Sequence, residues 1–117
     1  MLTVCKEFEF HAAHHLPCHD GKCKNVHGHG YVLEVEVAGG LREYGPDTGM
    51  IIDFSDLKRI VNEEVIEKLD HKNLNDLFEN PTAEVMVNWI AGVLSLSLQV
   101  IRVRLYETRT SYAEWKE

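Results

Sequence analysis

The sequence predicts an α+β fold, a four-stranded antiparallel sheet with two helices on one face, in the order β-β-α-α-β-β. Three observations support it. Two long segments near the N-terminus and two short ones near the C-terminus alternate apolar and polar residues, as half-buried strands do. Two segments between them carry apolar residues at helical spacing. The length of 117 residues lies within the roughly 100–150 residues of an ordinary domain, so we expect a single domain over residues 1-117.

The first two strands are expected to carry histidines on their buried faces. The first strand covers residues 3–14, and its apolar parity comprises Val4, Phe8, Phe10 and Ala12. His14 shares this parity, so a regular strand turns its imidazole inward. After a polar loop, the apolar face of the second strand comprises Tyr31, Leu33, Val35 and Val37. His27 and His29 continue that parity and are also expected to point inward.

Two helices are expected in the middle of the chain, each after a capping residue. Asp53 is expected to cap a helix over about residues 56–69, and Thr82 is expected to cap a second helix. The apolar stripe of the first helix comprises Leu57, Ile60, Val61 and Val65. The stripe of the second comprises Val85, Met86, Trp89, Ile90, Val93 and Leu94. Residues 70–80 are polar and are expected to be irregular.

The chain closes with two strands, over residues 100–107 and near 112–116. The buried parity of the first of these comprises Ile101, Val103 and Leu105. Glu107 shares that parity at the end of the strand, so its carboxylate is expected to face the buried side. A buried carboxylate needs partners, and a planar, guanidine-like ligand edge would supply two hydrogen bonds.

Composition excludes several classes of protein. The net charge of −7 disfavours a generic binder of nucleic acid or of anionic membranes, which is normally basic. Charged residues interrupt every apolar stretch, so no membrane span is expected. The first ten residues already have a strand pattern with charges, so we expect no signal peptide. Three cysteines are too few for a disulfide framework and fit a reducing, cytoplasmic location.

The unusual feature is histidine, since six of the seven lie between His11 and His29. His14, His27 and His29 share the buried faces of two strands, and alternate residues of a strand lie ~6–7 Å apart on one face. These three imidazoles can therefore bind one zinc ion and leave a fourth position open, as catalytic sites do. The rival interpretation is a structural zinc site that includes Cys18 and Cys23, but no second cysteine pair exists.

Two further groups could handle protons beside such a metal. Cys23 lies four residues before His27, and the flanking lysines Lys22 and Lys24 favour its thiolate. Asp70 and His71 follow the first helix and could act as an orienting carboxylate and a base. Each of these residues could equally be an ordinary loop or capping residue.

Six sequence pieces, spread over nearly the whole chain, together resemble the family of 6-pyruvoyl-tetrahydropterin and 6-carboxy-tetrahydropterin synthases. The most specific of them is the cysteine-x-x-x-His-Gly-His piece from Cys23 to His29. The pieces are Phe10-His11-Ala12-Ala13-His14, Cys23-Lys24-Asn25-Val26-His27-Gly28-His29, Asp47-Thr48-Gly49-Met50-Ile51-Ile52-Asp53-Phe54, Leu69-Asp70-His71-Lys72-Asn73-Leu74-Asn75, Asn80-Pro81-Thr82-Ala83-Glu84 and Glu107-Thr108.

This resemblance implies the tunnelling fold, in which three subunits close a barrel and two trimers stack into a hexamer with active sites at subunit interfaces. It implies that His14, His27 and His29 bind zinc. It also implies that Cys23 is the general base and that Asp70 and His71 are its acid/base partners. Glu107 would anchor the pterin, with contributions from Thr108 and Thr82.

The implied substrate is 7,8-dihydroneopterin triphosphate. The compact length resembles the bacterial carboxy branch, which releases acetaldehyde and triphosphate and serves queuosine synthesis. The first alternative is a pyruvoyl synthase of the biopterin route, and the second is a non-catalytic, zinc-stabilised binding domain. Relatives often carry Arg where this chain has His15. The residue that contacts the triphosphate is therefore not assigned, and the candidates are Lys22, Lys24 and Lys72.

Overall fold

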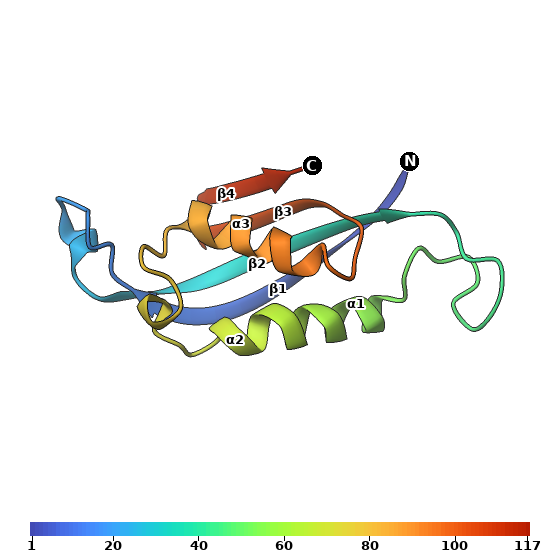
Figure 1. Cartoon of the computed structure of the whole chain (residues 1–117), viewed down its shortest axis with the longest axis horizontal. Helices are drawn as coiled ribbons and strands as arrows, with labels where there is room; N and C mark the ends of the chain where they lie inside the picture. The colour runs from blue at the N-terminus through green and yellow to red at the C-terminus, as the bar shows by residue number, and fades with distance from the viewer.

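A computed structural model describes residues 1–117 and confirms the predicted order of strands and helices (Figure 1). The four strands pair antiparallel in the order β1-β2-β3-β4. Their bounds are Leu2–His14 for β1, His27–Gly39 for β2, Val100–Thr108 for β3 and Ser111–Lys116 for β4. The helices cover one face of this sheet, and the buried residues of both layers form one core cluster.

The register of β1 and β2 brings the predicted histidines together. His14 lies opposite His27, and Ala12 lies opposite His29. Because successive side chains of a strand point to opposite faces, the three imidazoles project from the helix-covered face, in line with buried Phe10 and Tyr31. The parity argument for both strands is confirmed.

The first predicted helix is longer and less regular than expected. Asp53 caps it as predicted, because its carboxylate accepts a hydrogen bond from the backbone N–H of Ser55. The helical segment comprises α1 (Phe54–Val61), a π-helical turn (Asn62–Ile66) and α2 (Glu67–Leu69). It therefore starts two residues before the expected position.

The spacing of the buried residues on this segment explains the π-helical turn. They are Leu57, Val61, Val65 and Leu69, four residues apart each time. In an α-helix, a step of four residues overshoots one turn by about 40°, so four such residues would drift around the helix. The wider π-helical turn reverses part of that drift and keeps all four facing the sheet.

The helix α3 (Ala83–Leu94) begins where predicted but is rotated about its axis. Thr82 caps it through a 3.1 Å hydrogen bond from the N–H of Val85 to Oγ1. Val85, expected in the core, is 42% exposed, and Trp89 is half-buried against the ring of Phe78. The residues buried on α3 are Ala83, Met86, Val87, Ile90, Ala91 and Leu94. Both flanks of this helix are apolar, so spacing alone could not decide which flank faces β3 and β4.

The strand β3 contains a one-residue irregularity near each end. Glu36 pairs with Arg102, but Val37 pairs with Val100, so Ile101 is the extra residue. Val100 is consequently buried and Ile101 only half-buried, which corrects the predicted inward position of Ile101. A β-bulge inserts one unpaired residue and shifts the parity beyond it.

The molecule is elongated, with extents of 54 × 24 × 24 Å. The loop between β1 and β2 lies at one end of the long axis and the loop between β2 and α1 at the other (Figure 1). The sheet is open, and β1 and β4 are its two edge strands. None of the helices is long and apolar enough to cross a membrane.

Candidate metal centre

His14, His27 and His29 form a group in which one ring nitrogen of each residue lies within 4.8 Å of the others. The rings meet edge to face, with centroids 4.6–5.0 Å apart. His14 is completely buried, and the other two are partly exposed. His11 and His15 stay outside this group, as their opposite strand parity predicts.

Backbone carbonyls fix the protonation of two of these rings. Nδ1 of His14 lies 2.8 Å from the carbonyl oxygen of Pro81, and Nδ1 of His27 lies 2.7 Å from that of Asn25. A carbonyl oxygen only accepts, so each Nδ1 carries the hydrogen and each neutral Nε2 carries a lone pair. These two Nε2 atoms face each other at 3.1 Å. Two neutral rings in these tautomers direct both lone pairs at the same point, which is an arrangement that a bound cation would satisfy.

The geometry of the group fits zinc. Two nitrogens bound tetrahedrally at ~2.0–2.1 Å from zinc lie about 3.4 Å from each other, close to the observed contact. Nε2 of His29 is buried and has no hydrogen-bond partner, as expected of a nitrogen that serves as a metal ligand. Burial is also the main cause that lowers the pKa of His29, which favours the neutral, ligating form. Ligating histidines commonly donate their second N–H to a carbonyl, as His14 and His27 do here.

Glu107 connects the histidine group to a cavity. Its Oε1 lies 3.3 Å from Nε2 of His29 without a hydrogen bond between them. This inward position confirms the predicted parity, and Glu107 lies where the β3–β4 register shifts by one residue. The carboxylate adds to burial in raising the pKa of Tyr31.

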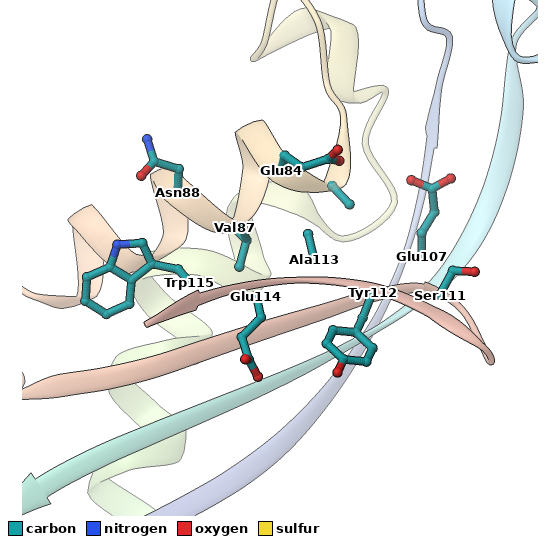
Figure 2. Close-up of a pocket in the computed structure, with 10 residues that line it drawn as sticks. Glu84, Val87, Asn88, Glu107, Ser111, Tyr112, Ala113, Glu114 and Trp115 are labelled. Atoms are coloured by element: carbon teal, nitrogen blue, oxygen red, sulfur yellow. The ribbon is translucent and has the colours of Figure 1, made fainter. Parts of the chain in front are cut away.

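The cavity beside Glu107 has a volume of about 500 Å³ and lies between α3 and β4. Figure 2 shows Glu107 and Trp115 at opposite ends of it, with Glu84 on the α3 side. The walls combine apolar side chains, including Val87 and Ala113, with three carboxylates, those of Glu84, Glu107 and Glu114. Such a mixture suits a flat, partly polar ring that presents hydrogen-bond donors.

Asp70 and His71 form a close pair at the edge of β1. Oδ1 of Asp70 lies 3.0 Å from Nδ1 of His71 and accepts a hydrogen bond from the backbone N–H of His11 at 3.0 Å. The His11 N–H is the main cause that lowers the pKa of Asp70. The backbone of His71 has a positive φ of 60°, which is uncommon for a residue other than glycine. Its imidazole is exposed.

The remaining predicted residues do not belong to the histidine group. Cys23 is half-buried in a 3₁₀ turn (Lys22–Lys24), and its sulfur is not among the converging ligand atoms. The Thr82 hydroxyl caps α3. Thr108 is exposed and lines a separate cavity with Tyr106 and Arg109, not the cavity of Glu107.

The family model of 6-pyruvoyl tetrahydropterin synthase matches residues 3–117, nearly the entire chain. The chain belongs to this family. The 6-carboxy-5,6,7,8-tetrahydropterin synthase of Haemophilus influenzae is 38% identical over 141 aligned residues and covers 100% of both chains. The enzyme of the same name from Synechocystis is 43% identical over 98% of this chain and 93% of its own.

The fold agrees with solved structures of the same family. The 6-pyruvoyl tetrahydropterin synthase of Caenorhabditis elegans superposes with a TM-score of 0.84 at 27% identity, covering 99% of this chain and 95% of its own. The fold is therefore the tunnelling fold that the sequence resemblance implied.

Sequence reasoning missed the groups that orient the histidines. The Pro81 and Asn25 carbonyls lie within sequence pieces that resemble the family, but a backbone acceptor has no residue-type signature. Glu84, at the edge of the cavity, also lies in such a piece and was assigned no role. Glu84 is exposed in the first turn of α3, on the flank that the apolar spacing did not select, so the sequence pattern offers no signal for it.

Proposed function

We propose that this chain is a zinc-dependent 6-carboxy-5,6,7,8-tetrahydropterin synthase acting on 7,8-dihydroneopterin triphosphate. The observation that carries the proposal is the lone-pair contact between His14 and His27, with the unpartnered Nε2 of His29 beside it. An open three-histidine site leaves one position for a substrate oxygen. A zinc ion there would act as a Lewis acid that makes neighbouring C–H protons of the substrate more acidic.

Glu107 is proposed to bind the pterin. Its side chain is 26% exposed and faces both the histidine group and the cavity. An ionised carboxylate accepts two parallel hydrogen bonds from a guanidine-like edge, and the pterin ring presents such an edge. This contact would hold the pterin ring so that the side chain of the substrate is directed toward His29. Thr82 and Thr108 remain proposed contributors, although the structure assigns the first a capping role.

Cys23, Asp70 and His71 are proposed to move protons. Nδ1 of His71 lies 3.0 Å from Oδ1 of Asp70, and the exposed ring can take up or release a proton. Cys23 is proposed as the base that removes the acidified proton.

The carboxy product is favoured because two of the relatives, over nearly their full length, bear that name. The pyruvoyl reaction is the alternative, since the Caenorhabditis elegans relative bears that name. We also propose that the chain works in the cytoplasm as a hexamer built from two trimers, with active sites at subunit interfaces. The edge strand β4 and the part of the edge strand β1 before His11 present backbone groups for such assembly.

The decisive experiment incubates the zinc-loaded protein with 7,8-dihydroneopterin triphosphate and identifies the products by mass. We expect 6-carboxy-tetrahydropterin, acetaldehyde and triphosphate. A diketo side chain without acetaldehyde would establish the pyruvoyl alternative. The His29→Ala variant is the control and should form neither product. Unchanged substrate in the presence of stoichiometric zinc would overturn the enzymatic function.

A further inference from the structure

The segment that follows α2 lies along the outer edge of β1, next to the residue that the metal centre needs. Its backbone and side chains form hydrogen bonds with the N–H and C=O groups that alternate residues of β1 direct away from β2. His71 donates its N–H to the carbonyl of His11, and Ala13 donates its N–H to the carbonyl of Lys72 at 3.0 Å. Ala13 and Asn73 form a parallel bridge. The segment therefore acts as a short additional strand beside His14.

Asn75 continues this pairing with its side chain. The N–H of His15 donates to Oδ1 of Asn75 at 2.8 Å, and Nδ2 of Asn75 donates to the carbonyl of His15 at 3.0 Å. One side-chain amide thus makes both hydrogen bonds that a paired strand residue would make. This contact joins residues 60 positions apart, at the point where β1 ends and the loop toward Cys23 begins.

The contact is placed to control His14. His14 is the last residue of β1, and its partner across the sheet is His27. The Pro81 carbonyl orients its ring, but a ring can be oriented only if its own backbone is fixed. Strand ends fray readily, and the Asn75 amide holds the residue immediately after His14. A metal ligand must be held to within about 0.5 Å of its productive position.

We infer that Asn75 is a positioning residue for the metal centre, which acts by fixing the backbone of His15 and thereby the imidazole of His14. This inference rests on the proposed zinc site. Asn75 contacts neither substrate nor metal. Without its amide, the backbone N–H and carbonyl of His15 lose these two partners, and Nε2 of His14 is freer to move relative to Nε2 of His27.

The test compares Asn75→Ala with Asn73→Ala. Asn73 lies in the same segment, but its side chain makes only a local hydrogen bond, from the N–H of Asn75. We would measure zinc affinity by competition with a chromogenic chelator, the visible absorption of the cobalt-substituted protein, and the melting temperature of the metal-free protein. Asn75→Ala should bind zinc about tenfold to a hundredfold more weakly, as losses of orienting partners usually do. Its cobalt spectrum should change, and that of Asn73→Ala should not.

Asn75→Asp provides a milder second variant in case the alanine variant does not fold. It keeps the acceptor for the His15 N–H and loses the donor to the His15 carbonyl, so we expect a loss of up to about tenfold in zinc affinity. Unchanged affinity and cobalt spectrum in the folded variants would overturn the inference, as would equal losses in Asn73→Ala. A wild-type chain that binds no zinc would instead overturn the metal centre itself, and the inference with it.

Discussion

Glu107 is the residue that joins the histidine group to the cavity, and its charge should matter for ligand binding. We expect Glu107→Gln to weaken binding of an unreactive pterin by about tenfold to a hundredfold. A neutral amide keeps one acceptor oxygen and loses the other, so the loss is about one charge-assisted hydrogen bond, roughly 1.5–3 kcal/mol, and ~1.4 kcal/mol corresponds to one decade in affinity. Calorimetry measures the affinity. Zinc content should stay unchanged, and equal pterin affinity in both proteins would contradict the assignment.

Cys23 distinguishes an enzyme from a zinc-stabilised binding domain. Its sulfur lies outside the group of converging nitrogens, so Cys23→Ala should keep zinc and its melting temperature. Product formation should fall by about 10²–10⁴-fold, the usual contribution of a positioned base. Metal analysis, thermal unfolding and a product assay on the same preparations check these three results. A structural zinc site would give the opposite pattern, with loss of zinc and earlier melting.

Asp70 should make stability depend on pH. The His11 N–H favours its ionised form, so its pKa in the folded chain lies below the ordinary value of 3.8. Its contribution to stability is therefore complete above the unfolded-state pKa and is lost as the pH falls through the lower, folded-state pKa. Asp70→Asn should be less stable than wild type at pH 7, and this difference should narrow below about pH 4.

Urea unfolding of both proteins at a series of pH values measures this difference. Asp20→Asn, in the exposed loop after β1, is a control of the same charge change. A difference between wild type and Asp70→Asn that stays constant down to the most acidic pH would contradict the role of the His11 N–H.

The three histidines could be predicted from sequence because strand parity is a local, periodic property. His14, His27 and His29 needed only two regular strands to share a face. The groups that orient them could not be predicted in this way. The Pro81 carbonyl reaches His14 across 67 positions, and the Asn75 amide reaches a backbone rather than a side chain. Contacts of this kind depend on tertiary structure and leave no pattern in the residue types.

At the level of elements, the cap of α3 should contribute measurably to stability. Thr82→Ala removes the oxygen that accepts from the Val85 N–H, and loss of such a cap costs about 1 kcal/mol in free energy of unfolding. Thr82→Ser keeps the hydroxyl and should stay within a few tenths of the wild-type value. Urea denaturation of the zinc-saturated proteins checks both. Equal losses in the two variants would show that the threonine methyl group, not the cap, is responsible.

The element boundaries were predictable where a capping residue or a regular period marked them, as at Asp53 and Thr82. The irregular features were not. The extra residue Ile101 depends on how β3 meets β2, and the π-helical turn depends on how the helix lies against the sheet. Similarly, the exposed position of Val85 follows from which of two apolar flanks faces β3 and β4. These choices are made by packing, which periodicity does not encode.

For the whole molecule, removal of zinc should lower stability. The Nε2 atoms of His14 and His27 lie 3.1 Å apart, and Nε2 of His29 is buried without a hydrogen-bond partner, so a bound metal would satisfy all three nitrogens. A ligand that binds only the folded state stabilises it by about 2.7 kcal/mol at a hundredfold excess over its Kd. A chelator should therefore shift the urea midpoint of the wild type downward by a corresponding amount. His29→Ala should respond less, and identical midpoints with and without chelator would contradict a folded-state zinc site.

In the sequence the helices come between β2 and β3, although these two strands pair directly in the sheet. This order has a consequence for synthesis on the ribosome. Roughly sixty residues separate the end of β2 from the start of β3. At ~5–20 residues per second, β3 emerges about 3 to 12 seconds after β2 is complete. During that interval the hairpin of β1 and β2 has an open edge where β3 will pair, and unpaired edges of nascent chains invite aggregation. Slow codons within the α3 segment would lengthen this exposure, whereas prompt translation of β3 closes it.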